Sequence, residues 1–242
     1  MNADRPAAAS ALPSGPPTDL AGSDWLTDAR AEVVRDPDSI TRAFAFAARR
    51  VGRAPRRPDT DPAGVVHGTV DDAARASLVV SLADTVGTGP DCAARLVALY
   101  RQGDAAERRG VLRGLDALAE RDGLGSADTA AGCDAPALVA AGLELAADAL
   151  RTNDPSLVAA AVGPFGARYL DQHAWRHAIL KLVFQEVSLE AASGLADRAD
   201  DELERMARDF AAERQAAGRP VPTDLGLLTN IRLGTTPGTT KE

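Results

Sequence analysis

The stretch DQHAWRHAILKLVF, residues 171–184, stands at the centre of the segment that decides the fold, Arg151–Arg219. Its apolar residues recur at spacings of three and four positions, as Trp175, Ala178, Ile179, Leu182 and Val183. That spacing places them on one face of an α-helix, and the preceding Asp171 is a favourable N-cap. We therefore predict a helix that begins after Asp171 and buries this stripe in a core.

The end of the same segment predicts a second long helix, over residues 195–217. One face of it carries the apolar residues Leu195, Ala199, Leu203, Met206, Phe210 and Ala217. Two acid–arginine pairs at i,i+4 support the helix, Asp201 with Arg205 and Glu204 with Arg208. Each such pair contributes roughly 0.2–0.5 kcal/mol. Gly218 is placed to cap the C-terminus, and the prolines that follow would stop the helix.

The rest of the chain has the same character. Apolar residues at helical spacing follow capping or proline positions near residues 24, 37, 71, 90, 104 and 136, and no segment shows the strict alternation of a strand. We predict an all-α, single-domain fold over residues 23–230, a bundle of antiparallel or orthogonal helices, with stacked helix pairs as the alternative. Residues 1–22 and 231–242 are rich in Pro, Gly, Ser or Thr, so we expect disordered tails there.

Composition excludes several functional classes. The chain has 242 residues, 45% of them hydrophobic, which is ample for the core of one domain. Its net charge of -8 argues against a nucleic-acid binder, and no run of apolar residues is long enough for a membrane span. Cys92 and Cys133 form no metal-binding or redox motif, so we expect two thiols in a reducing cytoplasm, with a disulfide as the alternative.

The segment Arg151–Arg219 also carries short motifs whose order and spacing are more specific than any one of them. They are Arg151-Thr152-Asn153, Asp171 with Trp175, Leu180-Lys181 with Phe184, Gly194-Leu195-Ala196-Asp197-Arg198-Ala199, Glu213-Arg214 and Gly218-Arg219, with weaker matches at residues 50–53 and 98–108. In this order they resemble the EboA-like family, unevenly over residues 24–230. The resemblance implies a bacterial protein that acts in the biosynthesis or export of a secondary-metabolite precursor. It carries over no catalytic residue.

The chain departs from the family pattern at two places. Where the family has Asn-Pro-Tyr-Pro, this chain has Gly163-Pro164-Phe165-Gly166. Where the family has Arg-Ala-Asn, this chain has Arg198-Ala199-Asp200. If these positions contact a ligand, the ligand of this chain differs from that of other members.

The sequence contains no evident nucleophile–base pair, phosphate loop or metal cluster. We therefore predict a non-catalytic binding or scaffold protein, without a cofactor, that holds a metabolite or the proteins of a pathway. An apolar or aromatic metabolite is the expected ligand. The alternative is a metabolite-processing enzyme with a pocket between helices, which would bring together the candidate ligand-binding residues Arg151, Asn153, Asp171, Trp175 and Lys181. Each of these also has a structural explanation, as a helix end, a cap, a core residue or a surface residue.

Two further groups are candidate sites. Arg49, Arg50 and Arg53 cluster in an otherwise acidic chain and predict an anion or phosphate site, with a solvated connector as the alternative. His173 and His177 have the i,i+4 spacing of a metal-binding pair. However, the glutamate of the zinc-protease motif is missing and a lysine follows on the same face, so two surface histidines are the preferred interpretation.

Overall fold

A computed structural model describes residues 24–121, 124 and 136–230. Within these ranges every regular element is helical, and strand-type pairing is limited to an isolated bridge between Pro55 and Thr69. The elements are α1 (Asp24–Arg35), η1 (Pro37–Ser39), α2 (Ile40–Val51), α3 (Val70–Val86), α4 (Pro90–Gln102), α5 (Ala105–Glu120), α6 (Ala137–Arg151), α7 (Pro155–Ala161), α8 (Pro164–Tyr169), α9 (Gln172–Phe184), η3 (Leu189–Ala191), α10 (Leu195–Arg198), α11 (Asp201–Ala216) and α12 (Leu225–Asn230). The all-α prediction is confirmed, whereas the tails predicted at residues 1–22 and 231–242 lie outside the described residues.

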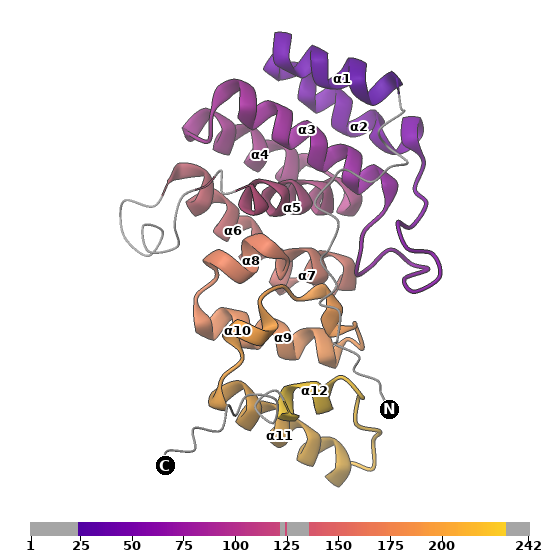
Figure 1. Cartoon of the computed structure of the whole chain (residues 1–242), viewed down its shortest axis with the longest axis vertical. Helices are drawn as coiled ribbons and strands as arrows, with labels where there is room; N and C mark the ends of the chain where they lie inside the picture. Colours follow the sequence, from indigo (N-terminus) through magenta and orange to yellow (C-terminus); the bar gives the residue numbers. More distant parts are fainter. Residues whose placement is uncertain (1–23, 122–123, 125–135, 231–242) are drawn as a thin grey trace, which may run out of the picture.

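The helices are stacked in chain order along the long axis of the molecule (Figure 1). Each packs mainly on helices close to it in sequence: α1 and α2 on α3, α3 on α5, α4 on α6, and α5 on α7 and α8. Further along the chain, α7 packs on α9, and α11 packs on α12. Of the two arrangements that the sequence leaves open, the structure has the stack of helix pairs. Such a stack buries a continuous core and exposes long lateral surfaces.

Local capping explains why several helices begin where the sequence predicts. The Asp104 carboxylate accepts a hydrogen bond from the Glu107 N–H, and the Asp104 N–H donates to the Glu107 carboxylate, both at 2.9 Å. In the same way, Asp171 accepts from the Ala174 N–H at 2.7 Å. These bonds satisfy N–H groups that have no partner within the first turn. They fix the starts of α5 and α9.

The prediction of one long helix over residues 195–217 is wrong in one respect, because the structure divides this stretch into two helices. α10 ends at Arg198, and Asp200 is extended, with φ -137° and ψ 174°, before α11 begins. The Asp200 carboxylate accepts from the Leu203 N–H at 3.0 Å, so this residue is an N-cap. An aspartate that can cap a helix competes with continuation of the preceding one. Within α11, the predicted pair of Glu204 and Arg208 forms at 2.5 Å.

Two short helices, α7 and α8, connect the upper part of the stack to α9. Each begins with a proline at its first position, Pro155 or Pro164. Gly142 allows α8 to pack closely on α6, because a Cβ atom there would lie 2.5 Å from the ring of Phe165. Near the end of α9, the Lys181 Nζ atom donates to the Leu150 carbonyl in the last turn of α6 at 2.6 Å, so these two helix ends lie side by side, where a surface groove forms.

The structure describes the surroundings of one of the two cysteines, Cys92. Cys92 is fully buried in α4, and burial raises the pKa of its thiol to about 11. Cys133 lies outside the described residues, so the state of the pair stays a prediction. None of the helices in the described ranges is long and apolar enough to cross a lipid bilayer.

Candidate functional site

A groove of about 600 Å³ lies between the end of α9 and the middle of α11. We call it the α9–α11 groove. It is lined by Asn153, His177, Leu180, Lys181, Phe184, Gln185 and Phe210, and its surface is mostly apolar. Small-molecule sites commonly have volumes of about 300–1,000 Å³ and apolar walls with a few polar groups. The groove therefore has the size and lining of a site for a small organic molecule.

The apolar wall of the groove is aromatic. Phe184, the last residue of α9, is 65% exposed, which is unusual for phenylalanine. Its ring centroid lies 6.1 Å from that of Phe210 on α11, with the two planes tilted by 53°. The guanidinium carbon of Arg214 lies 5.8 Å from the centroid of the Phe210 ring. The pair leaves an aromatic surface uncovered, on which a planar apolar group can pack.

The polar rim of the groove includes two of the five candidate ligand-binding residues, Asn153 and Lys181. The Lys181 Nζ atom donates to the carbonyl oxygen of Leu150 at 2.6 Å. That carbonyl belongs to the last turn of α6, where carbonyls lack intrahelical partners and the helix dipole favours a cation. Lys181 is therefore held at the rim by the end of another helix. The Oε1 atom of Gln185 is buried and has no hydrogen-bond partner among the described residues.

Arg151 lies beside a different groove, of about 500 Å³, on α4, α5 and α6. This second groove is lined by Tyr100, Arg101, Arg108, Glu144, Leu145, Ala147, Asp148 and Arg151. Arg151 contacts Asp148 at 3.0 Å, and the Tyr100 hydroxyl donates to the same carboxylate at 3.1 Å. Burial and the neighbouring Asp148 raise the pKa of Tyr100. Arg151 and Asp148 thus neutralise each other at this surface.

The remaining two candidates, Asp171 and Trp175, lie at the start of α9 and not in the α9–α11 groove. Asp171 caps the helix, and Trp175 is fully buried. The guanidinium carbon of Arg198 lies 4.8 Å from the centroid of the Trp175 ring, which is a cation–π contact. Capping and core packing are the structural explanations that we considered for these residues from the sequence. A ligand contact at either residue stays a prediction.

Arg198 joins three helices at this point. Its guanidinium group donates to the carbonyl oxygens of Gly166, Ala167 and Leu170, at 3.3, 2.6 and 2.8 Å. These carbonyls end α8, so Arg198 on α10 caps the C-terminus of α8 while it stacks on Trp175 of α9. We call this arrangement the Arg198 clamp. It explains structurally why Trp175 and Arg198 occur together in the sequence motifs.

The two places that depart from the family pattern have structural contacts in this chain. Asp200 accepts hydrogen bonds from Arg176 and from the Gln172 amide, and the bonds from Arg176 hold the pKa of Asp200 well below its usual range. Phe165 is buried in the core. Gly166 allows a close approach, since a Cβ atom there would lie 2.1 Å from the Ala161 carbonyl oxygen. Both departures therefore lie at joints between helices.

The three arginines of the predicted anion site are exposed at the end of α2 and just after it. They are Arg49, Arg50 and Arg53. The guanidinium carbon of Arg49 lies 5.6 Å from the ring centroid of Phe46, which is 40% exposed. This contact orders one of the three side chains against the helix surface. Anion binding by the cluster stays a prediction.

His173 and His177 are both exposed on α9, and their ring centroids lie 4.4 Å apart in an edge-to-face arrangement. In the part of the chain that the structure describes, no group of three His, Cys, Asp or Glu side chains gathers closely enough to hold a metal ion. The pair is placed as the surface-histidine interpretation requires. His177 also lines the α9–α11 groove.

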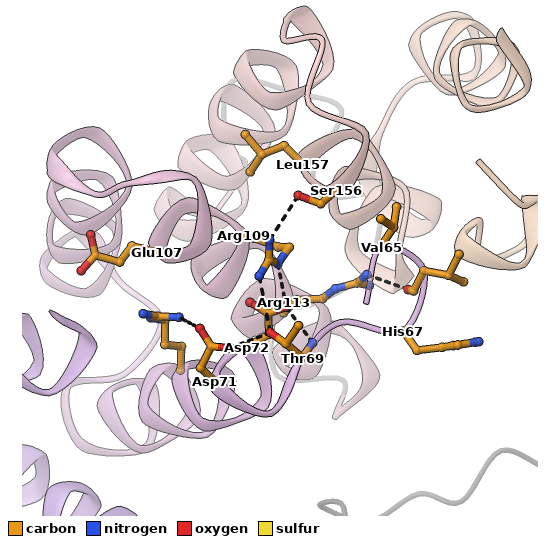
Figure 2. Close-up of polar contacts among 12 residues, drawn as sticks. Val65, His67, Thr69, Asp71, Asp72, Glu107, Arg109, Arg113, Ser156 and Leu157 are labelled. Atoms are coloured by element: carbon orange, nitrogen blue, oxygen red, sulfur yellow. Dashed lines mark hydrogen bonds and ion pairs between the residues drawn. The ribbon is translucent and has the colours of Figure 1, made fainter. Parts of the chain in front are cut away.

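A cluster of buried charges at the start of α3 was not predicted from the sequence. Figure 2 shows Arg109 of α5 between Asp72 and Thr69 on one side and Ser156 of α7 on the other. Its Nε donates to the Asp72 carboxylate at 2.6 Å, and its other nitrogens donate to the hydroxyls of Ser156 and Thr69 at 3.2 and 3.4 Å. The side chains of Asp72 and Arg109 are only 2% and 14% exposed. This Asp72–Arg109 cluster ties α3, α5 and α7 together.

Neighbouring charges extend the cluster. Asp71 pairs with Arg75 at 2.5 Å, and both side chains are almost fully buried. The Nε of Arg75 also donates to the carbonyl oxygen of Phe44 on α2, at 3.2 Å. Arg113 donates to the carbonyl oxygen of Val66 in the loop before α3, at 2.8 Å (Figure 2). The buried arginines thus hold backbone carbonyls as well as carboxylates, which offsets part of the cost of burying them.

Asp116 on α5 is a buried carboxylate that caps a helix remote in sequence. It accepts from the Phe165 N–H, in the first turn of α8, at 3.0 Å. Gly163 makes room for it, since a Cβ atom there would lie 2.3 Å from the Asp116 Oδ2 atom. Burial raises the pKa of Asp116 to about 6, although Arg113, 3.5 Å away, acts in the opposite direction. Asp116 therefore titrates at a higher pH in the folded protein than in the unfolded chain.

This shift predicts a pH dependence of stability. Because the folded state binds the proton more tightly, the stabilising contribution is complete below the unfolded pKa near 4 and is lost as the pH rises through about 6. Between pH 7.5 and pH 4.5 it amounts to about 2 kcal/mol. Urea unfolding of the wild type and Asp116→Asn at both pH values isolates this contribution, since the other carboxylates are common to both. Equal changes in the free energy of unfolding for the two proteins would contradict the prediction.

Comparison with known proteins gives a family match for the segment that runs from within α6 to α12. Residues 141–229 match the model of a family described as metabolite traffic protein EboA. Searches of curated proteins and of solved structures gave no match. The matched segment runs from within α6 to α12 and includes every residue that lines the α9–α11 groove, together with the Arg198 clamp. The match confirms, over residues 141–229, the resemblance to the EboA family that the sequence motifs predict.

Proposed function

We propose that the chain is a non-catalytic helical binding protein that holds an apolar or aromatic metabolite in the α9–α11 groove and acts in metabolite traffic in the cytoplasm. The description of the matched family supports the traffic role. The observation that carries the proposal is Phe184, a phenylalanine 65% exposed in a groove of about 600 Å³ within the matched segment. Exposed aromatic surface in a concave site is typical of ligand-binding proteins.

The distribution of the candidate residues supports binding over catalysis. The enzyme alternative would be favoured by a pocket on which several of the five candidate residues converge. Asn153 and Lys181 line the α9–α11 groove, whereas Arg151, Asp171 and Trp175 lie elsewhere. The same chain can also hold pathway proteins, as a scaffold, because a stack of helix pairs exposes long lateral surfaces.

Native mass spectrometry of the protein purified from its own host tests the proposal. We expect a small molecule that is present under gentle conditions and lost on denaturation. Phe184→Ala removes most of the aromatic surface of the groove, so its affinity for this molecule is expected to fall by at least about tenfold, and its occupancy with it.

Phe46→Ala is the matched control, because Phe46 is also an exposed phenylalanine, at 40%, but lies on α2. It should keep the bound molecule. A wild-type protein without a small molecule that copurifies with other pathway proteins would support the scaffold role instead. Equal retention of the molecule by Phe184→Ala would contradict binding in this groove.

A further inference from the structure

We infer that the α9–α11 groove selects ligands in which an aromatic or apolar body carries an anionic group, such as a carboxylate, sulfonate or phosphate. This inference rests on the proposed function and specifies its ligand class. Three features of the groove support it: the charge of its lining, the position of Lys181, and the exposed aromatic side chains of Phe184 and Phe210.

The lining of the groove has a charge opposite to that of the whole chain. The chain carries a net charge of -8, yet the lining residues in the described part of the chain include the cation Lys181 and no carboxylate. Arg214 adds a further cation against the Phe210 ring. A cationic patch attracts anions and disfavours cations, because the charges nearest the ligand dominate the local potential even in an acidic protein.

Lys181 is positioned to bind an anion without moving. One N–H of its ammonium group donates to the Leu150 carbonyl at 2.6 Å, which fixes the direction of the long side chain. An ammonium group has three N–H donors, so two remain for a ligand. A donor that is already ordered loses less conformational entropy on binding than a free lysine does. The Asn153 amide, on the same rim, supplies further neutral donors.

The aromatic wall sets the other half of the ligand. Phe184 and Phe210 are 6.1 Å apart and tilted by 53°, so a planar body can pack against Phe184 while its anionic end meets Lys181. Lys181 and Phe184 lie three positions apart on α9 and therefore share one surface of that helix. Charge-assisted hydrogen bonds are about twice as strong as neutral ones, so an anionic ligand gains more from Lys181 than a neutral analogue does.

Two fluorescent probes with the same aromatic skeleton test the inference on the full chain. 8-Anilinonaphthalene-1-sulfonate carries a sulfonate, and N-phenyl-1-naphthylamine lacks it. We expect the wild type to bind the sulfonate probe about tenfold more tightly than the neutral probe. Raising the NaCl concentration from 50 to 500 mM should reduce this preference, because the contribution of Lys181 is electrostatic.

Variants assign the preference to its residue. Lys181→Met should bring the two affinities within about twofold of each other, with the neutral probe unaffected, whereas Lys181→Arg should keep the preference. Near-UV circular dichroism checks that each variant keeps the native packing around its tryptophans. Phe184→Ala should weaken both probes.

The outcomes separate this inference from the proposed function. Equal wild-type affinities for the two probes, or a preference that Lys181→Met and salt leave unchanged, would overturn the anionic ligand class while aromatic binding stands. If neither probe binds, or if Phe184→Ala leaves both affinities unchanged, the proposed function fails and the inference fails with it.

Discussion

Replacement of Asp72 by alanine is expected to lower the free energy of unfolding by about 3–5 kcal/mol, the largest effect of any single substitution proposed for this protein. The reason is the partner that remains. Arg109 is only 14% exposed and its Nε would lose the carboxylate 2.6 Å away, while the Thr69 N–H would lose its acceptor at 2.9 Å. A buried guanidinium without a counter-ion costs far more than the ion pair contributed. Urea unfolding followed by far-UV circular dichroism measures the loss.

A double-mutant cycle tests the physical cause. Asp72→Leu combined with Arg109→Leu removes both charges, so it should cost clearly less than the sum of the two single substitutions. Asp72→Asn, which keeps an acceptor for Thr69 and Arg109 but loses the charge, should fall between wild type and Asp72→Ala. A loss below about 1 kcal/mol for Asp72→Ala, or strict additivity in the cycle, would show that the cluster is not a coupled unit.

The second large effect is expected for Arg198→Ala, which should lower the free energy of unfolding by about 3 kcal/mol. The substitution removes hydrogen bonds to three carbonyls that end α8 and the cation–π contact with Trp175 at 4.8 Å. Hydrogen bonds to a charged group contribute roughly 1.5–3 kcal/mol each when counted alone, but such values are not additive, and solvent reaches part of this half-buried group. Chemical unfolding gives the magnitude. Acrylamide quenching of Trp175 in a Trp25→Phe background should increase.

Arg205→Ala is the matched control for the Arg198 clamp. Arg205 makes ion pairs with two carboxylates, those of Glu202 and Asp209, but its side chain is 56% exposed. Exposed ion pairs contribute about 0–1 kcal/mol, so this variant should remain close to wild type in stability. Arg198→Lys keeps the charge but lacks the planar guanidinium fork that spans three carbonyls and stacks on Trp175, so its free energy of unfolding should fall more than that of Arg205→Ala. Similar losses for Arg198→Ala and Arg205→Ala would argue against the clamp.

Parts of the candidate site could be predicted from the sequence, and others could not. Asn153 and Lys181 were found because they belong to an ordered set of motifs. Phe210 has the spacing of a core residue on α11, and its position at the groove depends on where α9 lies. Arg75 left a signal that was not used, since it precedes Leu78 and Val79 by three and four positions and so lies on a core-facing stripe. A charge on such a stripe predicts a buried ion pair.

By itself, the sequence determined the helices, most of their starts and the family resemblance. The helices and their starts depend on interactions within four residues, such as the Asp104–Glu107 capping box and the apolar stripe of α9. Only the tertiary structure decided the stacking of helix pairs, the Asp72–Arg109 cluster and the α9–α11 groove. Each of these needs residues that are far apart in the chain. Asp72 and Arg109 are 37 positions apart. Asn153 precedes α9 in the sequence and Phe210 follows it, yet both line the same groove. The chain brings them together only when the helices pack, and helical periodicity carries no information about which helix will be the neighbour.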